Sequence, residues 1–445
     1  MKQRKSDCSK RAKNSELPKF RQLQRALYCK AKQERKVRFH SLYDKIWRED
    51  ILWEAWKQVR QNQGAPGIDG KSIEDILEQE QEAELIQELQ KQLKNQLYRF
   101  SPVRRVDIPK SKGGTRPLGI ATVEDRIVQT AMKIVLEPIF EADFHDCSYG
   151  YRPKRNAEQA SLAIQHDLYN RAWGVVEIDF KSYFTSIPHD RLMKLIAQRV
   201  SDGNMLKIIK ETLEVPVSYE GKLEATTVGV PQGSPLSPLY SNIYLNVADQ
   251  LWHSRKYPEE LGASIHRYAD DVVIVCKKNG KHALGAFVAI AKRLGLTVNP
   301  AKTRITELKT GFDFIGFEFV KRRSPTHGRN VIYIFPSKSS QKNIRRRIKK
   351  LTQRRAPVKP GEFIRNMNLV VGGWANYYRH TNAARTLRGL QQFINNRVRR
   401  YLHYRRKGRG FGFRQYPNEK LYEMGLIQIH SGWIKLGERP AHARQ

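Results

Sequence analysis

"RYADDVVIVC", residues 267–276, places two aspartates directly before a run of four aliphatic residues. An aliphatic run of this kind is typical of a short strand buried on both faces. A carboxylate at the end of such a strand is costly to desolvate, so we expect a positive partner to meet it. Because successive strand side chains point to opposite faces, Asp270 and Asp271 cannot be equivalent ligands unless a turn rotates one of them. The pattern predicts one direct cation ligand and one auxiliary acid.

A third acid, Asp179, lies near the end of the strand-like segment "WGVVEIDF", residues 173–180. Two short strands with acids at adjacent ends can bring those acids together around divalent cations. Mg²⁺ suits such a site, because it takes oxygen ligands and is often held by one or two carboxylates plus substrate phosphates. Two ions about 3.5 to 4 Å apart would clamp the attacking and leaving oxygens of an in-line phosphoryl transfer. Taken singly, Asp179 also fits a strand-end cap, and the double aspartate also fits simple turn chemistry.

Two loops carry groups that suit a nucleoside triphosphate. In "KSKGGTR", Lys110 and Arg116 flank a glycine turn that can bring backbone amides and cations to phosphates. In "VPQGSPLSPLYSN", Gln232 precedes a glycine that permits close backbone approach, and its neutral side chain can hydrogen-bond a nucleotide. Each loop alone is also compatible with ordinary loop chemistry. Their combination with the three acids favours a phosphoryl-transfer site.

Charge dominates the composition, since 81 Lys and Arg against 44 Asp and Glu give a formal net charge of +37 over 445 residues. An excess of this size indicates a polyanionic partner, and nucleic acid fits best. Residues 1–40 hold 14 Lys and Arg against 3 Asp and Glu. We interpret them as a nucleic-acid-binding arm, with an organellar transit peptide as the alternative. No apolar stretch approaches the roughly 20 residues of a membrane span, and the scattered cysteines lack the C-x-x-C pairing of a cysteine-rich zinc site.

The order of element types predicts an α+β domain followed by a helical module. Helical periodicity at 122–140 and 189–200 alternates with strand patterns, and residues 98–120 read as two strands joined by a basic hairpin. A further helical stretch is expected over residues 72–97. Past residue 337, apolar stripes with helical spacing lie between basic blocks. The stripes consist of Ile344, Ile348 and Leu351, and of Leu387, Leu390, Ile394, Val398 and Tyr401.

In chain order these segments resemble the reverse transcriptase/maturases encoded by bacterial group II introns. The resemblance runs from about residue 42 to about residue 405. It rests on eight ordered segments: "GAPGIDG", "RPLGIATVEDRIVQ", "SYGYRPKRNAEQA", "EIDFKSYFTSIPHD", "GVPQGSPLSPLYSNIYL", "RYADDVVIV", "GLTVNPAKT" and "FDFIGFEF". "FDFIGFEF" matches the primer grip of the family.

The resemblance implies the fold of a right-hand polymerase. Its domains would be a basic extension at 1–40, fingers and palm at 41–336, a mainly α-helical thumb and maturase domain at 337–405, and a second basic extension at 406–445. Asp179 and Asp270 would be the metal ligands, Asp271 the neighbouring acid, and the Phe180 carbonyl a further ligand. The implied cofactor is a pair of Mg²⁺ ions, for which Mn²⁺ can substitute.

The resemblance also implies contacts with nucleotides and RNA. The implied nucleotide contacts are Lys110, Arg116, Tyr183, Gln232 and Lys302. A bulky ring at Tyr183 would clash with a ribose 2′ hydroxyl and favour dNTPs, whereas the structural alternative is core packing. In "GGWANYYRH", the implied RNA-binding residues are Trp374, Tyr377, Tyr378 and Arg379. Their alternative is an aromatic core with an arginine at its rim.

The implied function is RNA-directed DNA polymerisation combined with intron RNA binding, splicing and retrohoming. The partners would be group II intron RNA or another structured RNA template, a DNA primer or target, and dNTPs, in the bacterial cytoplasm within a nucleoid-associated ribonucleoprotein. Two alternatives are a splicing-only maturase and a group II-like reverse transcriptase that serves defence or DNA repair. The tail after residue 405 contains no cysteine. We therefore expect no HNH endonuclease and no nicking of a target strand.

Overall fold

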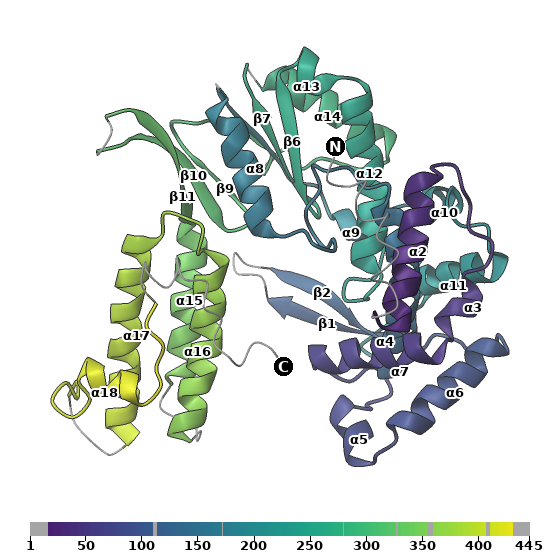
Figure 1. Cartoon of the computed structure of the whole chain (residues 1–445), viewed down its shortest axis with the longest axis horizontal. Coiled ribbons are helices and arrows are strands. Elements are labelled where there is room, and N and C mark those ends of the chain that lie inside the picture. The colour runs from purple at the N-terminus through teal and green to yellow at the C-terminus, as the bar shows by residue number, and fades with distance from the viewer. Residues whose placement is uncertain are drawn as a thin grey trace. The chain divides into compact units, whose positions relative to one another are not determined.

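The computed structural model describes residues 17–109, 114–170, 172–278, 280–325, 328–353, 359–405 and 410–429. The chain forms two compact units, each assembled from segments that are separated in the sequence. Unit 1 consists of Met1–Arg155, Ile178–Pro258 and Leu284–Thr303, and unit 2 consists of Asn156–Glu177, Glu259–Ala283 and Arg304–Gln445. Figure 1 labels the helices and most of the strands of both.

Unit 1 is mainly helical. Its helices are α2 (Lys19–Gln33), α3 (Tyr43–Ile46), α4 (Glu49–Asn62), α5 (Ile73–Glu78), α6 (Glu82–Lys94), α7 (Val123–Glu141), α9 (Tyr183–Ser186), α10 (His189–Ala197), α11 (Gly203–Glu214), α12 (Ser237–Ser254) and most of α14 (Lys281–Arg293), while α13 (Tyr257–Glu260) lies at the boundary with unit 2. The helix expected at 122–140 is confirmed as α7. Most of its residues are buried, and α2, α3, α4, α6 and α12 pack against it. Its charged residues after the first turn, Arg126, Lys133, Glu137 and Glu141, are only partly exposed, so α7 lies in the core of unit 1.

A small sheet completes unit 1. Its strands are β1 (Val103–Pro109), β2 (Thr115–Ile120), β4 (Val217–Tyr219) and β5 (Lys222–Glu224), in the order β2-β1-β4-β5. β1 and β2 pair antiparallel, which confirms the hairpin predicted over residues 98–120. β1 also pairs with β4 in parallel, which joins segments more than a hundred residues apart in the chain.

Unit 2 contains a sheet of short strands. Its members are β3 (Gly174–Ile178), which ends at the boundary with unit 1, β6 (Ala263–Tyr268), β7 (Asp271–Cys276) and β8 (Arg304–Glu307), in the order β6-β7-β3-β8. Three of these strands, β3, β6 and β7, are largely buried. β6 and β7 form an antiparallel hairpin, and helix α8 (Ala157–Tyr169) packs against both. Every residue of β7 after Asp271 is buried. This confirms that the run after the two aspartates is a strand covered on both faces.

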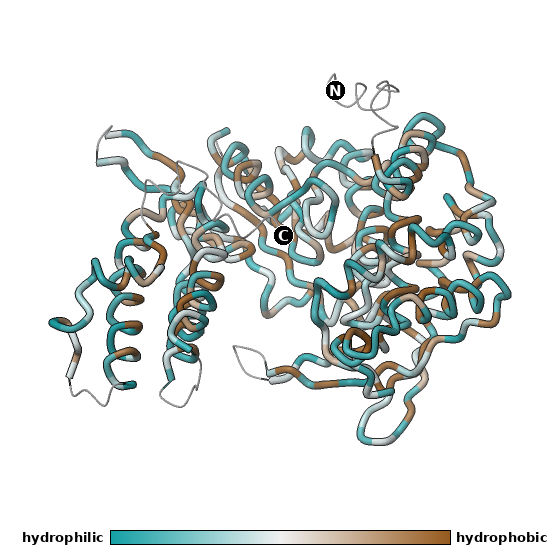
Figure 2. Tube along the Cα trace, turned by 60° about the horizontal axis from the view of Figure 1, so that its bottom comes forward, coloured by the Kyte–Doolittle hydropathy of each residue, from teal (hydrophilic) through white to brown (hydrophobic). Residues whose placement is uncertain are grey.

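The rest of unit 2 is a second sheet followed by helices. The strands are β9 (Phe312–Phe314), β10 (Phe317–Arg323) and β11 (Asn330–Pro336), and the helices are α15 (Lys338–Leu351), α16 (Pro360–Tyr377), α17 (Ala384–Arg405) and α18 (Asn418–Glu423). One apolar cluster spans both sheets and these helices. The stripes predicted in the sequence supply the α15 and α17 residues of this cluster, and α16 and α18, for which no stripe was predicted, contribute further residues. In Figure 2 apolar and polar colours alternate along the helices.

Helices with small sheets are consistent with the predicted α+β class. One expectation needs adjustment, because the helical stretch predicted over 72–97 is two helices, α5 and α6. Between them Glu80 takes a left-handed φ of 53°, and no glycine or proline signals the break. None of the helices in the described ranges combines the length and the apolar character that crossing a bilayer requires.

Candidate active site

Asp270 lies in the turn between β6 and β7. The strand register pairs Tyr268 with Asp271, so Ala269 and Asp270 form a two-residue turn. Ala269 has a φ of 58°, a left-handed conformation that costs a residue with a side chain about 1 kcal/mol or more. Buried Arg267 donates from Nη1 to the Ala269 carbonyl at 2.9 Å. The guanidinium therefore supports the strained turn that carries Asp270.

The two aspartates of this hairpin occupy different environments. Asp270 is half-buried in the turn, whereas Asp271 is exposed as the first residue of β7. Burial, and then the nearby charges of Tyr378, Tyr268 and Asp271, raises the pKa of Tyr377 in α16. The field of Asp271 thus reaches an aromatic side chain of the helical part of unit 2.

Asp179, in unit 1, contacts the segment "NPAKT" through its side chain and its backbone. Asn299 donates from Nδ2 to Oδ2 of Asp179 at 3.1 Å, and Nζ of Lys302 lies 3.4 Å from the same oxygen. The backbone N–H of Asp179 donates to Oγ1 of Thr303 at 3.4 Å. Because both charged side chains are at least one-third exposed, their ion pair contributes at most about 1 kcal/mol. Lys302 can therefore exchange this carboxylate for another anion at little cost.

Phe180 and Tyr183 pack together just after Asp179, with ring centroids 5.5 Å apart. Phe180 forms an isolated antiparallel bridge with Val298. The two hydrogen bonds of this bridge run from the Lys181 N–H to the Thr297 carbonyl and from the Asn299 N–H to the Asp179 carbonyl. Neither of them uses the Phe180 carbonyl. Tyr183 is buried, and its hydroxyl donates to the Ser241 carbonyl at 2.9 Å.

Two predicted nucleotide contacts, 116 residues apart in the sequence, lie side by side in unit 1. Arg116 of β2 donates from Nε to Oε1 of Gln232 at 2.8 Å, and the Gly119 N–H donates to the Gln232 carbonyl at 2.6 Å. Gly233 has a φ of 118°, and a Cβ on it would lie 2.2 Å from the Gly119 carbonyl oxygen. Only glycine permits this approach. Lys110, the third predicted cation of this set, lies outside the described residues.

The four aromatic and basic residues predicted to bind RNA also have contacts within unit 2. Nε1 of Trp374 donates to Oγ of Ser340 at 3.0 Å, and the hydroxyl of buried Tyr378 lies 2.6 Å from the same Oγ. Tyr377 donates its hydroxyl to the Ile315 carbonyl at 2.8 Å. Arg379 forms a surface ion pair with Glu158 at 3.0 Å. Trp374 and Tyr378 therefore anchor α16 on neighbouring segments, while Tyr377 and Arg379 keep exposed surface.

Sequence reasoning missed a basic and aromatic cavity beside α17. It has a volume of about 430 Å³ and is lined by Thr352, Gln353, Arg397, Arg400, Tyr401, Tyr404 and Arg405. The Arg400 guanidinium also lies 5.1 Å from the ring centroid of Phe411, whose side chain is largely exposed. Cations that line a concave surface next to an open ring suit phosphates and unpaired bases. The basic run "RVRRYLHYRR" is the available signal, but its pattern predicts only a basic helix that can contact phosphates and gives no indication of a cavity.

Comparisons with known proteins agree with this arrangement. Residues 108–319 match the family model "Reverse transcriptase (RNA-dependent DNA polymerase)", and residues 341–416 match "Group II intron, maturase-specific domain". Protein YkfC of Escherichia coli (strain K12) is 32% identical over 359 residues, which cover 72% of this chain and 93% of that protein. The group II intron-encoded protein LtrA of Lactococcus lactis subsp. cremoris is 36% identical over 213 residues, 48% of this chain and 35% of LtrA.

A reverse transcriptase segment followed by a maturase-specific segment defines an RNA-directed DNA polymerase with a maturase domain. The chain belongs to the family of group II intron reverse transcriptase/maturases. This confirms the resemblance found in the sequence. The chain spans nearly all of YkfC but about a third of the length of LtrA.

Proposed function

We propose that this chain is a right-hand polymerase that copies RNA into DNA by phosphoryl transfer assisted by two Mg²⁺ ions. In this proposal residues 41–336 are the fingers and palm, 337–405 the thumb and maturase domain, and 1–40 and 406–445 basic extensions. The observation that carries the proposal is the strand order of the β6-β7-β3-β8 sheet, in which β7 and β3 are hydrogen-bonded neighbours. β7 begins at Asp271, and β3 ends one residue before Asp179.

The carboxylates have the chemistry that Mg²⁺ requires. Asp179 and Asp270 are both half-buried and offer oxygen ligands, and the Phe180 carbonyl offers another. Asp271 would act as the auxiliary acid, and Mn²⁺ would accept the same ligands. When bound, the two ions polarise the attacking hydroxyl and neutralise charge on the leaving phosphate. Arg267 keeps the turn that carries Asp270 in place, and Lys302 balances the charge of Asp179.

The nucleotide contacts form a second part of the proposal. The hydrogen bond between Arg116 and Gln232 supports a shared role, since it places a cation and a neutral amide at one location. Lys110 and Lys302 would add phosphate contacts. Tyr183 would select dNTPs over ribonucleotides. Its hydroxyl donates a hydrogen bond to the Ser241 carbonyl, which holds the ring in a position where it would clash with a ribose 2′ hydroxyl.

RNA recognition is proposed for the helical part of unit 2. Tyr377 and Arg379 are the most exposed of the four predicted contacts, and the cavity beside α17 adds arginines that lie next to aromatic rings. The partner proposed here is structured RNA, with a group II intron favoured by the maturase-specific match. The polymerase would act in a ribonucleoprotein with that RNA.

Primer extension by Asp270→Asn tests the polymerase assignment. We expect extension on an RNA template with dNTPs and Mg²⁺ to fall at least about 100-fold, because even losing a partner of a metal ligand costs about 10- to 100-fold. RNA binding should stay near the wild-type level, since the substitution lies in the β6–β7 turn. Asp190→Asn, an exposed acid in α10, is the matched control and should extend normally. Wild-type extension by Asp270→Asn would overturn the assignment.

A further inference from the structure

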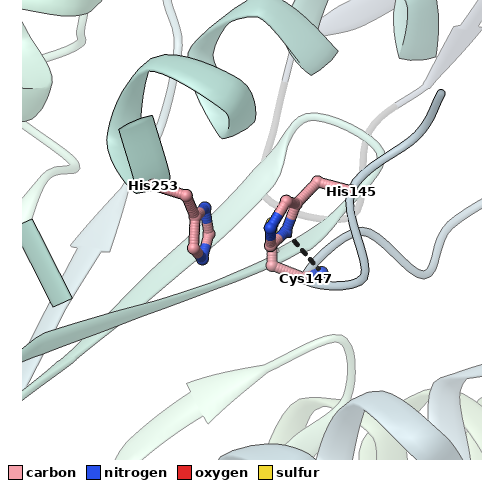
Figure 3. Close-up of side chains that lie close together, drawn as sticks. All are labelled: His145, Cys147 and His253. Atoms are coloured by element: carbon pink, nitrogen blue, oxygen red, sulfur yellow. Dashed lines mark hydrogen bonds between the residues drawn. The ribbon is translucent and has the colours of Figure 1, made fainter. Parts of the chain in front are cut away.

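Three side chains of unit 1, of the types that ligate transition metals, lie close together and include none of the aspartates of the polymerase proposal. They are His145 and Cys147, in the loop that follows α7, and His253, in the last turn of α12 (Figure 3). One ligand atom from each lies within 4.8 Å of the other two. Nothing in the polymerase proposal uses these residues. Their nitrogen and sulfur atoms also differ in kind from the oxygen ligands of a Mg²⁺ site.

The hydrogen bond of His253 determines which of its ring nitrogens can bind a metal. Nδ1 lies 2.8 Å from the carbonyl oxygen of Asp249, one helical turn earlier in α12. A carbonyl only accepts, so Nδ1 carries the proton and Nε2 of the neutral ring presents its lone pair. Metal-binding histidines almost always donate their other ring nitrogen to a carbonyl or carboxylate in this way. His253 is therefore already in the tautomer that a metal site needs.

His145 directs the opposite ring nitrogen toward the third ligand. The backbone N–H of Cys147 donates to Nδ1 of His145 at 3.2 Å, as the dashed line in Figure 3 shows. The lone pair of Nδ1 thus faces Cys147, whose thiol is free of any disulfide and buried. The short spacing His-x-Cys brings both ligands into one turn of chain. His145 can bind a metal ion through Nδ1 once the weak hydrogen bond from the backbone N–H of Cys147 is broken.

The two imidazole rings lie face to face, with centroids 3.6 Å apart and planes inclined by 23°. A tetrahedral zinc ion needs ligand atoms about 2.0 to 2.3 Å from it and lone pairs that converge. A shift of the half-buried His253 ring that keeps the hydrogen bond from Nδ1 to the Asp249 carbonyl would draw the three ligand atoms together and open the stack. A cavity of about 590 Å³, lined by His145, Asn246 and Gln250 among others, lies beside His145.

We propose that His145, Cys147 and His253 bind one Zn²⁺ ion, with a water molecule as the fourth ligand. The thiol proton of Cys147 is released to solvent as the thiolate binds, and both imidazoles bind as neutral rings. The ion ties the loop after α7 to the end of α12, two segments about a hundred residues apart in the chain. The ion would therefore stabilise the packing of these two segments, and the three protein ligands leave one position open to solvent.

Co²⁺ serves as a spectroscopic probe for this site, because a thiolate ligand produces a charge-transfer band in the near ultraviolet. The full-length chain, stripped with a chelator and held in excess Mg²⁺, should develop this band at one equivalent of Co²⁺, and Zn²⁺ should displace it. Cys147→Ser should abolish the band, whereas Cys276→Ser, which alters a second buried cysteine outside any disulfide, should retain it. A band that survives in Cys147→Ser, or no band in the wild type, overturns the proposal.

Thermal unfolding provides a second measurement that does not depend on the spectrum. Zn²⁺ should raise the melting temperature of the wild type and of Cys276→Ser, but not that of Cys147→Ser or His253→Gln. The melting temperatures measured with chelator show whether each variant folds. Equal stabilisation of the wild type and His253→Gln by Zn²⁺ contradicts the site. The polymerase variant Asp270→Asn should keep both the band and the zinc-induced rise.

Discussion

A buried carboxyl in unit 1 makes the free energy of unfolding of this protein change with pH in the mildly acidic range. Asp125, in the first turn of α7, is 2% exposed and accepts a hydrogen bond from the Tyr98 hydroxyl at 2.6 Å. Burial raises its pKa to about 6, although hydrogen bonds from Tyr98, Thr122 and Ser101 oppose the rise. An unfolded aspartate has a pKa of about 3.9. The folded state therefore holds a proton more tightly than the unfolded chain does.

The sign of this difference gives a prediction. Where the folded state binds more protons, the free energy of unfolding falls as pH rises, here between about pH 4 and pH 6 and by up to about 3 kcal/mol. Asp125→Asn cannot ionise and should flatten that part of the profile, measured by urea unfolding across the range. The exposed control Asp190→Asn should follow the wild-type slope. Identical slopes in Asp125→Asn and wild type would refute the assignment.

Single residues show where sequence reasoning ends. The non-equivalence of Asp270 and Asp271 could be predicted from the alternation of side chains along a strand, but it arises differently, because Asp270 lies in the turn and only Asp271 belongs to β7. Buried Arg267 could not be predicted, since an arginine is rarely buried unless it has a partner. Asn299 contacts Asp179 from 120 positions away. Local patterns carry no information about such a contact, so only the recognised family order put both segments in one site.

At the scale of elements, the pairing of β2 with the segment around Gln232 depends on one glycine. Gly233→Ala would place a methyl group against the Gly119 carbonyl at 2.2 Å and would force a φ of 118° on a residue with a side chain. We expect the two segments to separate and the hydrogen bond between Arg116 and Gln232 to be lost. Steady-state primer extension should show a KM for dNTPs raised about 10-fold or more, as removing a charge-assisted contact of about 1.5 to 3 kcal/mol implies.

A second glycine variant separates this effect from a general loss of stability. Gly285 lies inside helix α14, and a Cβ there meets no atom within 4 Å. Gly285→Ala should therefore stabilise the chain by up to about 1 kcal/mol and leave the KM for dNTPs unchanged. If Gly233→Ala also leaves that KM unchanged, the pairing of the two segments is not required for nucleotide binding.

Elements with strong local periodicity were predictable, and elements held by distant partners were not. The stripes of α15 and α17 and the β1–β2 hairpin follow from spacing alone. The parallel pairing of β1 with β4, in contrast, brings Val103 beside Val217 and has no local signal. The zinc-type cluster was missed for the same reason. A search for paired cysteines cannot find one cysteine joined by two histidines from separate segments.

For the whole molecule, the chemistry of the ligands separates two kinds of metal site. The polymerase proposal uses oxygen atoms of aspartates, which suit Mg²⁺, whereas the cluster near α12 offers nitrogen and sulfur, which suit Zn²⁺. Excess Mg²⁺ should therefore leave the second site to zinc. Because the two sites prefer different metals, the experiments can reject the Mg²⁺ polymerase site and the Zn²⁺ site independently of each other.

The net charge of +37 makes RNA binding by the whole molecule dependent on salt. Each phosphate neutralised by an arginine steepens the slope of log K against log salt by about 0.7 to 0.9, because bound counterions are released. Arg400→Gln, in the cavity beside α17, should lower RNA affinity and reduce that slope by about one such contact, measured by fluorescence anisotropy with structured RNA over a salt series. Arg388→Gln removes the same charge from an exposed position of the same helix, outside the cavity. Equal losses in both variants would show that α17 acts only through its overall charge, whereas a loss confined to Arg400→Gln identifies the cavity as a phosphate contact.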